Sequence, residues 1–259
     1  MDEVEFHCEP PTNLPTMVVA FGGWVDAGEA ATSALRSLVR QLAATPLATI
    51  DPEEFVDFTT IRPVVRLSAE GQRRIRWPRI AFWTWQPPAG GAGLLLFRGV
   101  EPQRRWRTYA TALLDVAARC GVQRIVSLGA MLADLSHTRP PRVTGSSTDP
   151  RWHAQFEAWG MARRSRYEGP TGIASVMLEA ARHRGIASLT NGPSPPLSPE
   201  DDESGDAPSA AVCRGPPARP GAGCVPPECS RAGLSDALRP GGGPGRRDPG
   251  LCAAARAGV

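Results

Sequence analysis

The chain has 259 residues, of which 41% are hydrophobic and 21% are charged, as in an ordinary soluble globular protein. Its formal net charge of +3 is too small to indicate a nucleic-acid or acidic-membrane partner. All 29 basic residues are arginine. Together with the abundance of Ala, Gly and Pro, this favours coding bias in GC-rich DNA over selection for guanidinium groups.

The sequence predicts neither a secretory signal nor a membrane-spanning segment. The N-terminus is acidic, unlike a secretory signal, and no apolar run approaches the ~18 residues of a membrane span. Only Cys8 and Cys120 precede residue 200, and the cysteine spacings contain no Cys-x-x-Cys pair and no nearby His, which argues against zinc. We expect a cytoplasmic protein with free thiols, no metal and no cofactor.

The composition changes abruptly after Thr190. From Asn191 onward, Pro and Gly make up roughly a third of the residues, which is typical of disordered sequence. The last aromatic residue is Tyr167, so the later segment cannot bury enough apolar surface to offset its conformational entropy. We therefore divide the chain into a folded domain at 1–190 and a disordered tail at 191–259. The tail is either natural or an out-of-frame translation product, and we favour the second explanation.

The first 190 residues alternate strand and helix patterns. Thr16–Phe21 is an apolar run typical of a buried strand, and a glycine-rich turn at 22–28 leads to helical apolar spacing over Glu29–Ala44. Further strands are predicted at Phe55–Phe58, Val64–Leu67, Arg73–Trp77, Ile80–Trp85, Gly93–Phe97, Gln123–Leu128, Arg142–Thr144 and Ile186–Leu189, and further helices at Arg104–Arg119, Asp149–Trp159 and Ile173–Arg184. This order predicts an α/β protein, a three-layer αβα sandwich around a mostly parallel mixed sheet.

The glycine turn that follows the first strand has two interpretations. A helix N-terminus can bind phosphate, but Gly-Gly-Trp-x-Asp-x-Gly is neither the dinucleotide fingerprint nor a P-loop. An aspartate repels phosphate and caps a helix well. We interpret Asp26 as a helix cap more readily than as a ligand contact.

A dense polar cluster at 129–140 follows a buried strand, at the sheet edge where α/β proteins bind ligands. Asp134 and His137 could act as an acid/base couple. No nucleophile elbow accompanies them, because Thr144–Ser147 is not Gly-x-Ser-x-Gly. Hydrogen bonds that order the loop are the favoured role, and the catalytic residues are left unknown.

A turn at Tyr167–Gly172 precedes a predicted helix, which Thr171 is expected to cap, and the carboxylate of Glu168 could line a pocket with Asp134. The expected pocket at the carboxyl edge comprises Trp24, Asp26, Glu29, Asp134, His137, Thr138, Arg139, Glu168 and Thr171. Cys120 ends a helix with no His nearby, so we expect a packed thiol.

Two segments, Arg73–Trp77 and Arg104–Arg107, mix arginine with aromatic residues, as single-strand nucleic-acid binders do. Because the overall charge is near neutral, solvated faces with extended arginines are the favoured interpretation.

Six segments in series resemble the proteasome assembly chaperone family, in particular its actinobacterial members. They are Phe21–Thr32 (FGGWVDAGEAAT), Asp57–Pro63 (DFTTIRP), Gly99–Pro102 (GVEP), Leu128–Asp134 (LGAMLAD) with His137–Pro140 (HTRP), Val143–Gly145 (VTG) and Tyr167–Ile173 (YEGPTGI). Each segment is weak alone, and their common order indicates the family.

The resemblance implies an αβα fold similar to that of nucleoside phosphorylases, homo-oligomeric assembly, and no established catalytic residues. Relatives continue beyond the position of Ile186 with a core strand and C-terminal helices, where this chain has the Pro/Gly tail, so the domain is expected to be incomplete. The chain also ends in Ala257-Gly258-Val259, without the hydrophobic-Tyr-any motif that some relatives dock into the proteasome.

Two functional hypotheses follow. The first is a non-enzymatic assembly chaperone that binds a protein, proteasome-related in this family, and self-associates, without nucleic-acid or membrane partners. The second is an enzyme or binder of a small molecule, a nucleoside or a carboxylate, which would fit the carboxylate–amine ligase label that some relatives carry. The sequence contains no ATP-binding motif to support that label.

Overall fold

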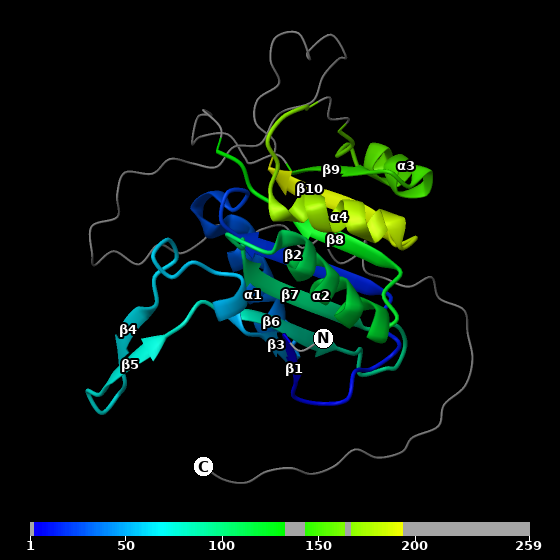
Figure 1. Ribbon diagram of the computed structural model, residues 1–259. Coiled ribbons are helices and arrows are strands. Elements are labelled where there is room, and N and C mark those ends of the chain that lie inside the picture. The colour runs from blue at the N-terminus through cyan, green and yellow to red at the C-terminus, as the bar shows by residue number, and fades with distance from the viewer. Residues whose placement is uncertain (1–2, 133–142, 164–166, 194–259) are drawn as a thin grey trace, which may run out of the picture. The chain divides into compact units, whose positions relative to one another are not determined.

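The computed structural model describes residues 3–132, 143–163 and 167–193. These ranges form one eight-stranded sheet and a separate two-stranded hairpin (Figure 1). Within them, no helix combines the length and the apolar character needed to cross a bilayer.

The large sheet is parallel in its centre and antiparallel at its flanks. The strand order is β1-β3-β6-β7-β2-β8-β10-β9, and β7, β2, β8 and β10 run parallel. The other pairings are antiparallel. The strands are β1 Val4–Phe6, β2 Thr16–Gly22, β3 Thr45–Ile50, β6 Ile80–Trp85, β7 Leu94–Val100, β8 Arg124–Leu128, β9 Val143–Ser147 and β10 Ala187–Pro193.

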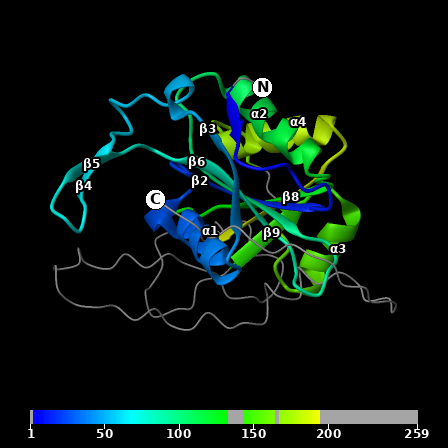
Figure 2. The ribbon, with the colours of Figure 1, turned by 90° about the horizontal axis from the view of Figure 1, so that it is seen from below.

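Helices cover both faces of this sheet. Helix α1 (Ala30–Gln41) packs on β2 and β7, while α2 (Trp106–Arg119) and α4 (Ile173–His183) contact each other on the opposite face (Figure 2). Helix α3 (Pro150–Ala158) packs on β9 at the end of the sheet. Short 3-10 helices occupy Ala27–Glu29 (η1) and Pro52–Glu54 (η2). The expected three-layer αβα sandwich around a mixed sheet is confirmed.

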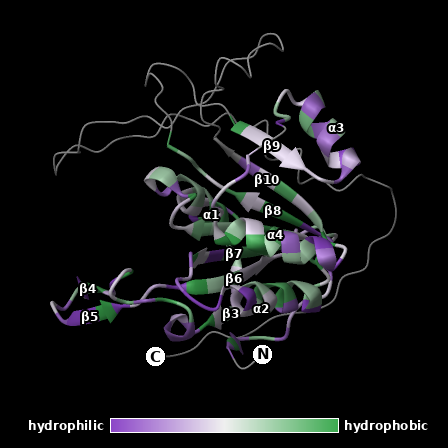
Figure 3. Ribbon diagram, turned by 45° about the horizontal axis from the view of Figure 1, so that its top comes forward, coloured by the Kyte–Doolittle hydropathy of each residue, from purple (hydrophilic) through white to green (hydrophobic). Residues whose placement is uncertain are grey.

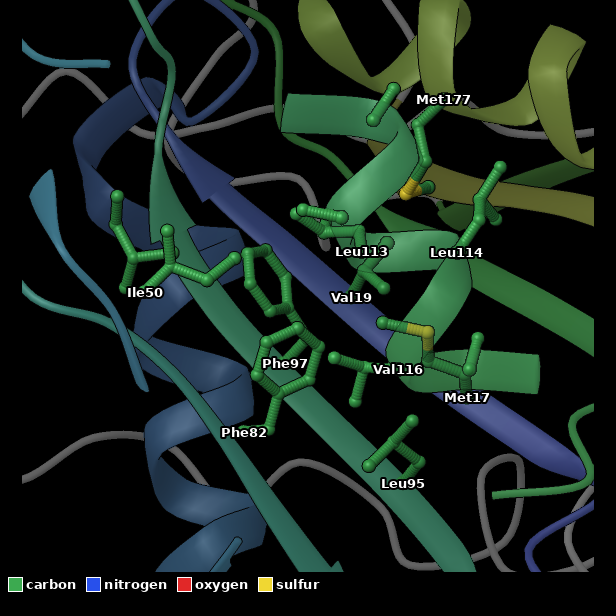
Figure 4. Packing of buried hydrophobic residues seen from close by; sticks show 14 of the residues in the cluster. Met17, Val19, Ile50, Phe82, Leu95, Phe97, Leu113, Leu114, Val116 and Met177 are labelled. Atoms are coloured by element: carbon green, nitrogen blue, oxygen red, sulfur yellow. The ribbon is translucent and has the colours of Figure 1, made fainter. Parts of the chain in front are cut away.

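Strand β2 supplies side chains to both layers, because successive residues of a strand point to opposite faces. Met17, Val19 and Phe21 belong to the large core under α2 and α4. In that core, Leu113 and Val116 of α2 pack among the side chains of β2, β6 and β7 (Figure 4). The intervening Val18 and Ala20 are also buried, on the side where α1 packs on β2.

Most predicted elements occur within a few residues of their expected positions, but the segment before the hairpin differs. Phe55–Phe58 is not a strand: the amide of Val56 donates to the carbonyl of Pro52, and the carboxylate of Asp57 accepts from the amide and hydroxyl of Thr59. These local hydrogen bonds coil the backbone into consecutive turns.

Two strands of the sheet were not predicted. Strand β1 has only three residues, too few to show alternation. Strand β3 contains Pro46, which normally argues against a strand inside a sheet. Its pairing with β6 shifts register between Pro46 and Ala48, and a bulge of this kind accommodates a proline.

The sheet continues past the predicted domain boundary at Thr190. Strand β10 extends to Pro193, and Asn191 pairs with Leu128 of β8 and with Gly145 of β9. Residues 194–259 lie outside the described residues, so both explanations of the tail stay predictions.

The hairpin of β4 (Val64–Leu67) and β5 (Arg73–Arg76) projects from the body and is exposed along its whole length (Figures 1 and 3). We call residues 62–77 the arm. Its two strands, VVRL and RRIR, combine aliphatic side chains with arginines (Figure 3), and no helix of the described residues covers either face in the views of Figures 1 and 2.

Two glycines with the same left-handed backbone give a test of the packing between α2 and the segment before β2. Gly121 (φ +74°) follows the C-cap of α2, and an added Cβ would lie 2.2 Å from the carbonyl oxygen of Thr12. Gly71 (φ +77°), in the turn of the arm, has no atom within 4 Å of the same position. Both alanine variants carry the backbone strain of roughly 1–2 kcal/mol.

We expect Gly121→Ala to lower the free energy of unfolding by at least about 2 kcal/mol more than Gly71→Ala, because its methyl group collides with a backbone atom. Urea unfolding of the two variants measures this difference. Equal losses would show that the Thr12 segment moves away at little cost.

Candidate functional site

The carboxyl ends of the four parallel strands meet at one edge of the sheet, and the segments singled out in the sequence meet there too. Helix α1 follows β2, and α2 follows β7. Helix α4 precedes the parallel strand β10 and therefore also begins at this edge. Ligands of open α/β sheets bind at this place.

Glu101, directly after β7, connects three of these segments. Its Oε2 accepts a hydrogen bond from the amide of Trp24 (3.2 Å), and its Oε1 accepts one from the amide of Ile173 (2.9 Å). Its own amide donates to the carbonyl of Gly22 (2.7 Å). The carboxylate thus ties the β2–α1 loop to the first turn of α4, where a negative charge is favoured by the helix dipole.

Glycines leave the space that this carboxylate occupies. A Cβ on Gly23 would lie 2.9 Å from the Cβ of Glu101, and a Cβ on Gly172 would lie 2.9 Å from its Oε1. At Gly99, a Cβ would lie 2.5 Å from the hydroxyl of buried Tyr109. The glycines of two separate motifs, Gly23 and Gly172, therefore serve the junction around Glu101, and Gly99, close to Glu101 in the chain, allows the close approach of Tyr109.

The carboxylate of Asp26 caps the first turn of α1, in agreement with the favoured interpretation, although Glu29 occupies the N-cap position itself. Asp26 is 7% exposed, and its Oδ1 accepts from the amides of Ala31 (2.8 Å) and Thr32 (3.1 Å) in the first turn of α1. Its other oxygen accepts from the Thr32 hydroxyl. Both oxygens of the Asp26 carboxylate are therefore already used in internal hydrogen bonds.

The segment after β8 joins the same edge through its backbone. The amide of Ala130 donates to the carbonyl of Val25 (2.7 Å), and the amide of Ala27 donates to the carbonyl of Ala130 (3.0 Å). Met131 and Leu132 follow directly.

The other described members of the expected pocket, Trp24, Glu29, Glu168 and Thr171, lie on the loops of this edge, and the pocket itself stays a prediction. Glu29 is largely exposed and pairs with Arg36 along α1 at 3.5 Å. Glu168 and Thr171 are exposed in the turn before α4. Trp24 lies next to this turn, with its Cε3 3.9 Å from the Cβ position of Gly172.

The expectation that Thr171 caps α4 is wrong. Gly172 occupies the N-cap position and offers no side chain. The free amide of Ile173 is satisfied instead by Glu101, which lies 72 residues away in the sequence and which local capping rules cannot identify.

Asp134, His137, Thr138 and Arg139 lie outside the described residues, so the acid/base couple stays a prediction. Among the described residues, no three His, Cys, Asp or Glu side chains are grouped as a metal site requires. Cys120 is fully buried, and burial raises the pKa of its thiol to about 11. It is therefore a packed thiol at neutral pH and a poor nucleophile.

Four large apolar side chains face solvent on the loops of this edge. Trp24, Met131, Leu132 and Tyr167 are 57%, 49%, 60% and 66% exposed. We call these four residues the edge patch. Several large apolar side chains exposed on the loops of one edge are candidates for an interaction surface.

Sequence reasoning missed Glu101. A signal was present, because Gly99-Val100-Glu101-Pro102 directly follows a predicted strand, as the loop with Trp24 and Asp26 follows another. A carboxylate at the end of a central strand lies at the carboxyl edge by topology alone.

Fold and site together define a three-layer α/β protein whose described carboxyl edge combines hydrogen-bonded polar groups with exposed apolar side chains. A family model described as the PAC2 family matches residues 20–212, and the chain belongs to this family. The match confirms the resemblance found in the sequence and continues past Thr190.

Solved structures give the same assignment. A PAC2 family protein from Streptomyces avermitilis is 38% identical over 69% of this chain and 74% of its own, with a TM-score of 0.62. A proteasome-assembly chaperone homologue from Mycobacterium tuberculosis is 39% identical over 68% and 73%, with a TM-score of 0.60. PbaB of Pyrococcus furiosus, an archaeal proteasome activator, shares the fold at 15% identity over 73% and 78% (TM-score 0.57). A search of curated proteins found no match.

We expect Glu101→Ala to lower the free energy of unfolding by about 2 kcal/mol, because two backbone amides lose a charged acceptor. Glu29→Ala is the matched control, since Glu29 is an exposed glutamate at the same edge, and it should change stability by less than about 0.5 kcal/mol. Chemical denaturation gives both values, and hydrogen exchange should quicken at Trp24 and Ile173 in the first variant only. Similar behaviour of the two variants would contradict this role of Glu101.

Proposed function

We propose that this chain is a non-enzymatic assembly factor that acts by binding proteins. One observation carries the proposal: the described polar side chains nearest the centre of the carboxyl edge are committed to internal hydrogen bonds, while the edge patch faces solvent. The carboxylates of Asp26 and Glu101 already hold helix and loop amides. Apolar surface rimmed by polar groups is the usual composition of a protein interface.

The partner that we propose is proteasome-related. The supporting comparison is the Mycobacterium tuberculosis relative, a proteasome-assembly chaperone homologue at 39% identity. Aromatic residues are enriched in the centres of interfaces, so Trp24 and Tyr167 are the residues of the edge patch from which we expect the largest contribution.

The test mixes the full-length chain with the purified proteasome α-type subunits of its own organism and measures binding by native electrophoresis and surface plasmon resonance. We expect Trp24→Ala combined with Leu132→Ser to weaken binding at least about tenfold, a loss of about 1.4 kcal/mol. Both side chains are more than half exposed, so the unfolding free energy should stay nearly unchanged.

Pro88→Ser is the control, because Pro88 is also exposed but lies in the loop between β6 and β7, at the opposite, amino edge of the parallel strands. Absence of binding by the unaltered chain, or equal weakening by the control, would count against the proposal. Self-association is part of the same proposal, and light scattering of the free chain should give a mass above the 27.6 kDa of one copy.

The alternative function, a small-molecule enzyme or binder, depends on Asp134 and His137 and stays a prediction. The similarity to nucleoside phosphorylases implied by the family also stays one. Thermal-shift measurements with nucleosides, nucleotides and amino acids test the alternative function, and a raised melting temperature with one of these ligands would favour it.

A further inference from the structure

The arm has two chemically different faces, which follow from its strand register. Val65 pairs with Ile75, and Leu67 pairs with Arg73, so these side chains share one face, which is mainly aliphatic. On the other face Arg66 lies opposite Arg74. Arg76, two residues from Arg74 along β5, adds a third guanidinium group to this basic face.

This arrangement is unfavourable for an isolated hairpin. Like charges directly opposite each other destabilise a strand pair, and a two-stranded hairpin without further cover is at best marginally stable in water. Val65, Leu67 and Ile75 are 55%, 69% and 61% exposed. The hairpin thus loses stability through its opposed arginines and through its uncovered aliphatic side chains. A partner that covers the aliphatic face and neutralises the basic face would explain why both features are present.

The positive charge continues from the arm onto the body. A groove of about 270 Å³ at the base of the arm is lined by Arg62, Arg66 and Arg76 together with Ile61, Val64, Trp77, Pro78 and Val100. Burial, together with the neighbouring charges of Arg36, Arg79 and Arg76, lowers the pKa of Arg98 on β7. The base of the arm therefore attracts carboxylates.

We propose that the arm binds an extended segment of a partner protein, with alternating acidic and aliphatic residues, which adds to the outer edge of β5 as a third strand. This inference names the recognition element of the partner and rests on the protein-binding function proposed above. Along β5 the sequence Arg74-Ile75-Arg76 would face acidic, aliphatic and acidic residues in turn, because paired strands place opposed side chains on the same face.

Strand addition supplies what the hairpin lacks. Among the described residues, β5 has β4 as its only neighbour in the sheet, so its outer edge is available for main-chain hydrogen bonds. A third strand brings the hairpin to the size at which small sheets become independently stable. The carboxylates of the new strand neutralise the charges of Arg74 and Arg76 and so relieve the repulsion between the arginines of the basic face.

Other occupants fit less well. A nucleic-acid strand would satisfy the arginines but would leave the aliphatic face in water, and Trp77 already packs on Phe58 with ring centroids 4.8 Å apart. The acidic stretch Glu200–Asp206 of this chain (EDDESGD) has carboxylates but no aliphatic residue. Protein with an alternating pattern matches both faces.

The test uses the full-length chain and a fluorescein-labelled peptide, Ser-Gly-Glu-Val-Glu-Val-Glu-Gly-Ser, followed by fluorescence anisotropy. We expect saturable binding, weakened at least about tenfold in the variant Arg74→Gln with Arg76→Gln. A control variant, Arg40→Gln with Arg107→Gln, removes two exposed arginines outside the arm and should bind within about twofold of the unaltered chain.

Three further probes decide the class of partner. A peptide of the same composition with its glutamates and valines in separate blocks, and one with lysine in place of glutamate, should both bind at least about tenfold more weakly. Absence of saturable binding of the alternating peptide, equal binding of the blocked peptide, or tighter binding of a single-stranded oligothymidylate would overturn the proposal.

Hydrogen exchange separates lost recognition from lost structure. The alternating peptide should slow exchange of the amides of β4 and β5, and without peptide the Arg74→Gln, Arg76→Gln variant should exchange there no faster than the unaltered chain, because a repulsive pair has been removed. Faster exchange in that variant would overturn the proposal. Binding to proteasome subunits is measured independently. A chain that binds the alternating peptide but no proteasome subunit would therefore support this proposal and contradict the proposed function.

Discussion

The carboxylate of Glu101 accepts hydrogen bonds from two backbone amides, those of Trp24 and Ile173, which lie 77 and 72 residues away in the sequence. The arrangement of the whole carboxyl edge follows from this double contact. It sets the β2–α1 loop against the start of α4, while the pairing of Ala130 with Val25 and Ala27 brings in the segment after β8. Loops of different origin thereby become one surface, and the edge patch is presented on it.

The layered core was predictable because its signals are local and periodic. The continuous apolar run of β2 and the helical apolar spacing of α1 both arise from the geometry of a single element, and both elements are present in the structure. Asp26 was identifiable for the same reason, since a carboxylate a few residues before a helix has few other partners.

The features that could not be predicted depend on contacts between residues far apart in the sequence. Pro46 argues against a strand until its bulge against β6 is known. Thr171 has the chemistry of a cap, but a distant carboxylate satisfies the helix that it precedes. Only the register of the hairpin shows that Arg66 lies directly opposite Arg74. From the sequence alone, both arginines are expected to be ordinary solvent-exposed residues.

The site also differs in character from the expected pocket. A cluster of Asp, Glu, Thr and Trp invites a chemical interpretation, yet a polar side chain buried at the end of a sheet must first satisfy backbone donors. Asp26 does this for α1 and Glu101 for α4. On the described loops the edge patch stays exposed together with Glu29, Glu168 and Thr171, so both apolar and polar groups are left to contact other molecules.

The arginines of the arm have a consequence for the chain before it meets any partner. An exposed strand edge with aliphatic side chains nearby is a template on which further copies of the same strand can stack. Guanidinium groups on β5 would lie against those of an identical strand, so repulsion opposes such growth. The basic face therefore also acts as a gatekeeper against fibre formation, a protection that lasts until carboxylates from another molecule neutralise it.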